Sequence, residues 1–168
     1  KLGAFPLNWW LPDVYEAAAP EVAGFLSTSM KAAAVLFLMR VTALAPNPAF
    51  AAVLPGIGAL TALVGAFLAL RQESLQRLLA YSSLAHAGLL ILGVGAWQAL
   101  GRDAAASASL LFYLVAYACM SNGAFMFLKA TGLTTRTELR GLAARQPGPA
   151  AAFAVLLFAL GGLPPTGG

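Results

Sequence analysis

Long runs of apolar residues, separated by short segments with charges and turn-forming residues, dominate the chain. A helix needs about twenty apolar residues to cross a hydrocarbon core of roughly 30 Å. Windows of that length predict four complete membrane-spanning helices and one partial one, near residues 22–44, 50–70, 75–98, 105–129 and 148–168. We therefore expect an all-α fold, a polytopic bundle of transmembrane helices.

The first segment, residues 1–21, is rich in proline and tryptophan and predicts an interfacial loop ahead of the first span. Trp9 and Trp10 suit positions at the level of the lipid headgroups. The chain begins without a methionine and ends within a run of proline and glycine. We expect residues 1–168 to be the central fragment of one larger transmembrane domain.

Composition excludes a soluble protein, because 60% of the residues are hydrophobic and only 10% are charged. The net charge of +4 comes from basic residues that are scattered singly, so nucleic acid is not an expected partner. One cysteine, Cys119, and one histidine cannot form a disulfide, ligate an iron–sulfur cluster or build a zinc site. The chain is therefore expected to bind no metal and no cofactor.

Basic residues between the spans predict the orientation of the helices. The loops after every second span hold most of them, with Arg71 and Arg77 in one loop and Arg136–Arg145 in the other. The opposite loops hold one arginine each. By the positive-inside rule, the two basic loops are expected in the cytoplasm, and the high alanine, leucine, glycine and arginine content suggests a bacterial plasma membrane.

Lys31 lies in the middle of the first span, where a charged side chain costs about 2.5–3.5 kcal/mol. It should face a polar interior, where burial disfavours its charged form and a nearby carboxylate favours it. Ser27 and Thr28 share its helix face, and Gly24 with the Ser-Thr-Ser run predicts a discontinuous helix around Lys31. The sequence is compatible with two roles for Lys31, a proton relay and one half of a static internal ion pair.

His86 shares a helix face with Ser82 and Ser83, and its near-neutral pKa suits a proton relay. A histidine bonded to one serine hydroxyl at a helix contact is the alternative. Tyr81 and Tyr117 add hydroxyl groups, which either hold water or brace the packing.

Two further patterns concern packing. The second span carries small residues at spacings that make one smooth face, which predicts close approach of a neighbouring helix: Gly58, Ala62, Gly65, Ala66 and Ala69. The run LGGLPPTGG at residues 160–168 predicts a helix break or a turn that lines a cavity.

Four segments, in this order and spacing, resemble a known family over essentially the whole chain: PLNWWLPDVYEAAAPEVAGFLSTSMKAA, LQRLLAYSSLAHAGLLILG, FYLVAYACMSNGAF, and LRGLAARQP followed by LGGLPPTGG. They are similar to the antiporter-like membrane subunits shared by respiratory complex I and multi-subunit cation/proton antiporters. The stretches DVYE and RGLA most resemble the subunit-N branch of that family.

The resemblance implies a larger bundle of two inverted halves, in which a lysine on a broken helix exchanges protons with a glutamate. Lys31 matches that lysine; the glutamate belongs to an earlier helix, and a second lysine is expected after Gly168. Asn8 stands where the family commonly has histidine, and Gln76 where a basic residue often precedes Arg77. These departures put the proton entry at the cytoplasmic side in doubt.

The resemblance further implies a proton-translocating subunit of NADH:quinone oxidoreductase, a translocase without redox groups of its own. Flavin, iron–sulfur clusters and quinone would belong to partner subunits. The alternatives are a subunit of a Na⁺ or K⁺/H⁺ antiporter and a passive assembly subunit. The expected relay residues, with their supporting polar neighbours, are Lys31 and His86, with Ser27, Thr28, Tyr81, Ser82 and Tyr117.

Overall fold

A computed structural model describes residues 2–45 and 47–163, and the described part is helical with one isolated β-bridge. In chain order the elements are α1 (Trp10–Ala17), α2 (Pro20–Leu44), α3 (Pro48–Ala69), α4 (Leu75–Ala99), α5 (Ala104–Thr131), the 3₁₀ turn η1 (Arg136–Leu139), α6 (Leu142–Arg145) and α7 (Pro147–Leu160). Helices α2 to α5 are each long and apolar enough to cross a membrane. Their ends differ from the predicted windows by two residues or fewer.

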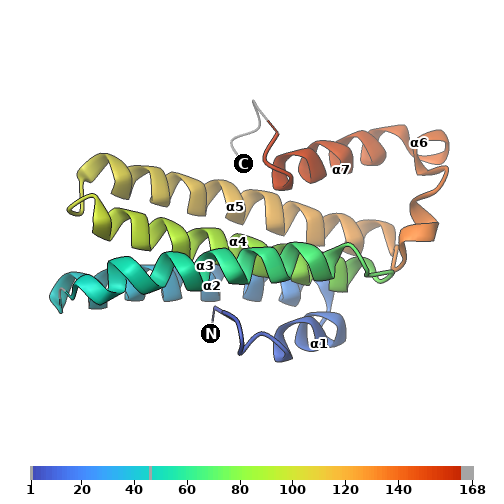
Figure 1. Cartoon of the computed structure of the whole chain (residues 1–168). Helices are drawn as coiled ribbons and strands as arrows, with labels where there is room; N and C mark the ends of the chain where they lie inside the picture. Colours follow the sequence, from blue (N-terminus) through green and yellow to red (C-terminus); the bar gives the residue numbers. More distant parts are fainter. Residues whose placement is uncertain (1, 46, 164–168) are drawn as a thin grey trace.

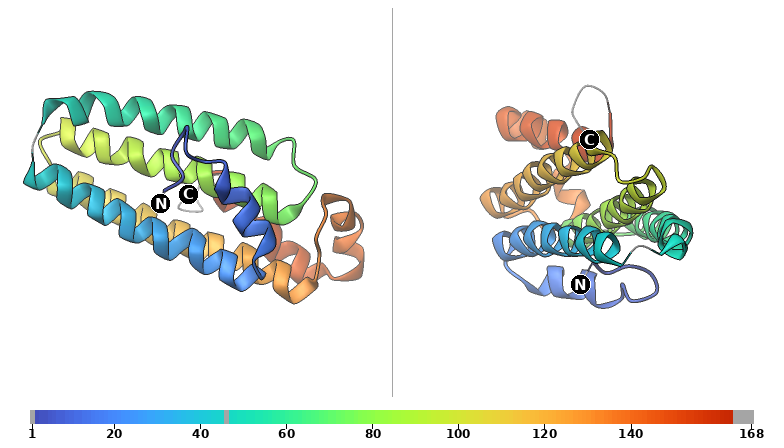
Figure 2. Two further views of the ribbon diagram at one scale, coloured as in Figure 1. Left: turned by 90° about the horizontal axis from the view of Figure 1, so that it is seen from below. Right: turned by 90° about the vertical axis from the view of Figure 1, so that its left-hand side faces the viewer.

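The four long helices lie side by side and alternate in direction, with α1 and α7 on opposite sides of the bundle (Figures 1 and 2). Helix α4 packs against α1, α2, α3 and α5. It is the most deeply buried of the four long helices, with 61% of its most apolar window inside the bundle. Helix α4 is therefore the centre around which the polar site is built.

Glycines bring α3 and α4 into backbone contact, as the small-residue face of the second span predicts. A Cβ atom at Gly58 or at Gly65 would lie 2.6 Å from a backbone nitrogen of α4. Gly88 on α4 faces Ala62 and Gly58 in the same way. Ala66, which was expected on this face, is exposed instead.

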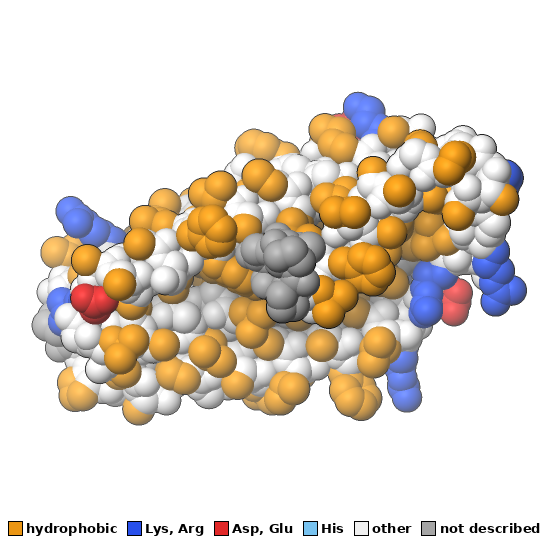
Figure 3. Space-filling model, turned by 90° about the horizontal axis from the view of Figure 1, so that it is seen from above, with side chains coloured by type: hydrophobic (Ala, Val, Ile, Leu, Met, Phe, Trp, Pro, Cys, Tyr) orange, Lys and Arg blue, Asp and Glu red, His pale blue; other side chains and the backbone are white. Residues whose placement is uncertain are grey.

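The two basic loops lie at the same end of the bundle. The amide of Leu75 donates to the carbonyl of Thr134 at 2.8 Å, and the amide of Arg136 donates to the carbonyl of Glu73 at 2.9 Å. Hydrophobic side chains cover the long sides of the molecule while charged side chains gather toward its ends (Figure 3). The alternation that the loop charges predict is therefore present, and the compartment that this end faces stays a prediction.

Helix α2 is continuous through Lys31, so the predicted discontinuity there is wrong. The hydroxyls of Ser27 and Thr28 donate to the carbonyl of Gly24, at 2.8 and 3.1 Å, within the same helix. Such bonds satisfy the hydroxyls without interrupting the backbone ladder. Gly24 serves packing, since a Cβ at this position would lie 3.1 Å from the Cβ of Phe125 on α5.

Irregular backbone occurs instead at residues 2–9, ahead of α1. The amide of Phe5 donates to the hydroxyl of Thr61, midway along α3, at 3.1 Å. The segment before α1 therefore lies beside the middle of α3, and residues 10–17 form a helix; the interfacial position of residues 1–21 stays a prediction. Pro12 falls in the first turn of α1, where a proline costs no helical hydrogen bond. Trp9 is 72% exposed and suits the expected surface anchor.

Helix α7 has 14 residues, or about 21 Å at 1.5 Å per residue, and is too short to cross a membrane alone. It ends at Leu160, where the sequence predicts a break, and its buried Ala159 packs beside Tyr117 and Met120 of α5. The end of α7 therefore lies partway along α5 rather than at an end of the bundle (Figure 1). The remainder of the predicted break, residues 164–168, lies outside the described residues.

The close contact of α3 and α4 generates a stability prediction. Gly88→Ala should destabilise the full-length protein by about 1–3 kcal/mol, because the new methyl group would press on the backbone of α3. Gly56→Ala is the matched control, since a Cβ at Gly56 meets nothing within 4 Å. Unfolding of the purified protein in mixed detergent micelles measures both variants. Equal stability of the two would contradict the proposed backbone contact.

Candidate functional site

Lys31 is buried at the junction of three helices, with 1% of its surface exposed. Its amino group donates to the carbonyl and the hydroxyl of Ser83 on α4, and to the hydroxyl of Tyr117 on α5 at 3.1 Å. An ammonium group has three donors, and here each has an acceptor. The nitrogen also lies 5.1 Å from the centre of the Tyr117 ring. The site therefore accommodates the charged form of Lys31 by hydrogen bonds.

Carboxylates do not take part in this arrangement. The salt bridges within residues 2–45 and 47–163 join Arg77 to Asp13 and Glu16, and Lys129 to Glu21, all of them partly exposed. The alternative of a static internal ion pair for Lys31 therefore finds no support in the described part of the chain. Neutral partners hold a proton on an amine less firmly than a carboxylate does.

Tyr117 and Ser83 form the connecting part of the site. The Tyr117 hydroxyl donates to the Ser83 hydroxyl at 2.9 Å and lies 3.4 Å from the carbonyl of Ser27. Each hydroxyl can both donate and accept. The two groups can therefore reverse their hydrogen bonds when Lys31 gains or loses a proton, without a change in the helix positions.

A second set of polar contacts joins α2 to α5. The hydroxyls of Ser27 and Ser121 lie 2.7 Å apart, and the Asn122 amide donates to the Thr28 hydroxyl at 3.2 Å. On α2 these bonds involve Ser27 and Thr28, which lie four and three residues before Lys31. They hold α2 against α5, the helix that carries Tyr117. They position the site rather than extend it.

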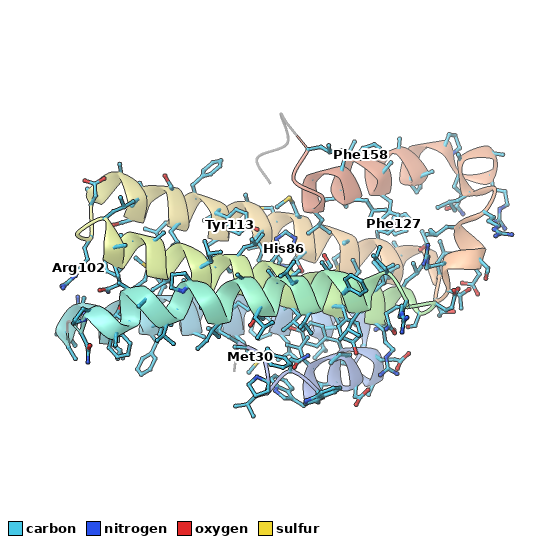
Figure 4. The ribbon with its side chains drawn as sticks, in the orientation of Figure 1. Met30, His86, Arg102, Tyr113, Phe127 and Phe158 are labelled. Atoms are coloured by element: carbon cyan, nitrogen blue, oxygen red, sulfur yellow. The ribbon has the colours of Figure 1, made fainter. Side chains whose placement is uncertain are left out.

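His86 is buried on α4, and its Nδ1 atom lies 2.6 Å from the Tyr113 hydroxyl. Figure 4 shows the two side chains together at the middle of the bundle. The Tyr117 ring, one turn along α5, also lies near the imidazole, with its centroid 4.9 Å from that of His86, and the backbone of Leu160 at the end of α7 interacts with the imidazole. The alternative, a serine hydroxyl as the partner of His86, finds no support in the described part of the chain, because Nδ1 is bonded to Tyr113 and the Ser83 hydroxyl binds Lys31.

The structure brings most of the expected residues together. Lys31, Ser27, Thr28, His86 and Tyr117 lie in one polar region, and Tyr117 is in contact with both Lys31 and His86. Within residues 2–45 and 47–163, no hydrogen bond links the side chains of Tyr81 and Ser82 to this region.

Ser83 rather than Ser82 completes the site, since neighbouring residues on a helix point about 100° apart. Tyr113 and Ser121 lie four residues before and after Tyr117, so the helical repeat predicts that all three share one face of α5. Tyr15 on α1, whose buried ring packs edge-on against Phe125 of α5, carries no local signal.

Both departures from the family pattern lie near α1, and one of them has a visible role. Asn8 is 2% exposed, within the irregular segment ahead of α1. The Gln76 amide donates to the carbonyls of Tyr15 at 3.2 Å and Ala18 at 3.0 Å, near the end of α1. Gln76 therefore supplies donors to carbonyls that the end of a helix leaves free.

Comparison with known proteins agrees with this architecture. A family model described as NADH:quinone oxidoreductase/Mrp antiporter, TM, matches residues 1–168. The chain belongs to this family. Curated relatives in the family are named NADH-quinone oxidoreductase subunit N. One from Sorangium cellulosum is 42% identical over 182 residues, with 100% of this chain and 35% of the relative covered. One from Solidesulfovibrio magneticus is 40% identical over 173 residues, and the match covers 100% of this chain and 36% of the relative.

Two solved structures share the fold. A chain of respiratory complex I from Thermus thermophilus, solved with bound aureothin, is 36% identical with a TM-score of 0.78, and the match covers 98% of this chain and 36% of that one. A chain of an archaeal membrane-bound sulfane sulfur reductase has a TM-score of 0.84 at 24% identity, and the match covers 96% of this chain and 34% of that one. At this identity the likeness shows the fold alone. The chain spans about a third of the length of the relatives that it matches.

The serine pair between α2 and α5 generates a second stability prediction. Ser121→Ala should cost about 0.6 kcal/mol of unfolding free energy, the mean for hydrogen bonds between membrane helices, because the Ser27 hydroxyl loses its partner on α5. Ser109→Ala on the same helix is the control, since exposed Ser109 bonds only to the carbonyl of Ala105. Unfolding in mixed micelles compares them, and a Ser121→Ala protein as stable as the control would contradict the role of the pair.

Proposed function

We propose that this chain is part of a proton-translocating membrane subunit of NADH:quinone oxidoreductase, and that Lys31 takes up and releases the proton. Membership of the family and the subunit-N relatives support the choice of complex. In this proposal the chain contributes no redox group. Flavin, iron–sulfur clusters and quinone act in partner subunits, and the energy of electron transfer reaches this subunit through its contacts with them.

The observation that carries the proposal is a buried amino group whose partners are neutral hydroxyls and a carbonyl. In such a site the charged and neutral forms of lysine differ little enough for a modest rearrangement to move the proton. A lysine paired permanently with a carboxylate would stay charged. The Lys31 environment therefore suits a group that is loaded and unloaded in turn.

His86 is the second relay group in this proposal. Tyr117 lies between the two, with its hydroxyl on Lys31 and its ring against His86. The described residues form no direct hydrogen bond between Lys31 and His86, so water is proposed to complete the transfer. The Tyr113 hydroxyl fixes one ring nitrogen of His86, and the backbone of Leu160 also interacts with the imidazole, so proton exchange with water in this proposal requires one of these contacts to open.

The proposed location is a bacterial plasma membrane, with the loops that carry Arg71, Arg77 and Arg136–Arg145 on the cytoplasmic side. The shared end of these loops in the structure and their positive charge support this orientation.

Lys31→Ala tests the proposal in the native complex. Proton transfer through this site should fall by about 10²-fold or more, because a positioned proton carrier is lost. Lys31→Arg should fail to restore it, since arginine keeps its proton. Arg40→Ala on the same helix is the control, because Arg40 is exposed near its far end. NADH-driven, quinone-dependent proton uptake into membrane vesicles measures the effect, after a native gel confirms assembly.

Each alternative function has its own outcome in this experiment. An assembled Lys31→Ala complex that pumps normally would show Lys31 to be a structural cation. Loss of assembly in Lys31→Ala, with normal assembly in Arg40→Ala, would favour a passive assembly subunit. Proton movement that requires a Na⁺ or K⁺ gradient, in a complex without flavin and iron–sulfur subunits, would favour the cation antiporter.

A further inference from the structure

His86 contacts two tyrosines of α5 that are held with different firmness. Tyr117 is 1% exposed, and its hydroxyl has hydrogen-bond partners on both α2 and α4. Tyr113 is only partly buried, and within residues 2–45 and 47–163 its hydroxyl has one hydrogen-bond partner, the Nδ1 atom of His86 at 2.6 Å (Figure 4). Tyr113 can therefore leave the imidazole by breaking a single hydrogen bond, whereas Tyr117 cannot.

The bond from Tyr113 determines which nitrogen of His86 carries the proton. A neutral imidazole has one nitrogen that donates and one that accepts, and a phenol has one proton to donate. If Nδ1 donated to the Tyr113 oxygen, the phenol proton would need another acceptor, and the described part of the chain makes no such bond. A donor without a partner is unfavourable in an apolar environment. Tyr113 therefore donates to Nδ1, and the proton of the neutral imidazole lies on Nε2.

A groove between α4 and α5 opens beside Tyr113. It has a volume of about 420 Å³, and apolar residues of the two helices form most of its lining, among them Gly93 and Leu110. Gly93 helps to keep it open, since a Cβ atom there would lie 2.8 Å from a methyl group of Leu110. Tyr117 does not line this groove, and neither does Leu160, whose backbone also interacts with the imidazole. Of these contacts of the imidazole, the one with Tyr113 therefore has free space beside it.

We propose that Tyr113 is the positioning residue of His86, which holds the neutral imidazole with its proton on Nε2 and admits a proton to Nδ1 by turning its hydroxyl away into the groove. An imidazolium has two N–H donors and no acceptor, so Tyr113 cannot donate to it. The incoming proton comes from a hydronium ion, which leaves as water. The Nδ1 lone pair forms the new N–H bond, and Tyr113 keeps its own proton throughout.

This inference rests on the proposed relay role of His86, and a spectroscopic measurement separates the two. Nitrogen NMR spectra distinguish the two tautomers of a neutral histidine whether or not the protein pumps protons. The full-length subunit, with isotope-labelled histidine and in lipid bilayers, is compared with a His86→Gln variant, whose missing signals identify those of His86. We expect neutral His86 to be almost wholly the tautomer protonated on Nε2.

Tyr113→Phe removes the hydroxyl and keeps the ring, whose centroid lies 6.0 Å from that of His86. The signal of the tautomer protonated on Nδ1 should rise several-fold, because the hydrogen bond that disfavours it is lost. NADH-driven proton uptake by the complex should fall about tenfold, less than the ~10²-fold of a lost carrier, because the imidazole remains but is wrongly protonated. Tyr81→Phe is the control, since no hydrogen bond links the Tyr81 hydroxyl to the site in the described part of the chain.

The two measurements together decide the outcome. An unchanged tautomer ratio in Tyr113→Phe overturns the inference, whatever the rate of uptake. Normal uptake in Tyr113→Phe together with lost uptake in His86→Gln also overturns it and leaves the role of His86 intact. Normal uptake in His86→Gln overturns both. Equal losses of uptake in Tyr113→Phe and Tyr81→Phe overturn the inference too, since they would show a general effect of removing a phenol.

A variant in the groove tests the movement of Tyr113 without touching its hydroxyl. Leu89 lines the groove and is 46% exposed, so a larger side chain fits there without disturbing the core. Leu89→Phe should leave the tautomer ratio unchanged and lower proton uptake several-fold, because Tyr113 loses the space into which it turns. Leu63→Phe on α3 is the control, since Leu63 is 67% exposed and does not line the groove. Equal uptake in the two variants would overturn the proposal.

Discussion

The structure depends above all on the burial of one amino group. A lysine at the centre of a membrane span costs about 2.5–3.5 kcal/mol unless protein groups replace the lost water. Here α4 supplies a carbonyl and a hydroxyl, and α5 supplies a phenol. Helix α2 can carry Lys31 only where both neighbours present these groups at once. The packing of three helices and the chemistry of the site are therefore one constraint.

Helix α4 meets this constraint because its faces differ. One face carries Gly88 and lies against the backbone of α3. Another carries Ser83 and His86, which contact α2 and α5. The first turn of the helix holds α1 through Gln76 and Arg77. The helix with the most buried surface thus also organises the polar groups, and its small residues let the neighbours come close enough to share them.

The end of α7 adds an irregular element at the same depth as the site. Its buried Ala159 packs beside Tyr117, and the carbonyl of Leu160 interacts with His86. The other irregular segment, residues 2–9, also reaches the middle of the bundle, through the bond from Phe5 to Thr61. Irregular backbone within a membrane is tolerated only where protein or water covers it. Residues 2–9 lie against α3 through this bond, whereas residues 161–163, which follow α7, are exposed on the described surface.

The sequence by itself determined the four spans, the common end of the basic loops, the glycine contact of α3 and the burial of Lys31 among polar groups, because hydropathy, charge and residue size act locally. It placed the irregular backbone around Lys31, whereas the hydroxyls of Ser27 and Thr28 bond within their own helix. Only the tertiary structure decided that Ser83 and Tyr117 hold Lys31 and that Tyr113 holds His86. Those contacts join residues on different helices, and their rotation and depth relative to one another follow from packing, which no single segment of sequence encodes.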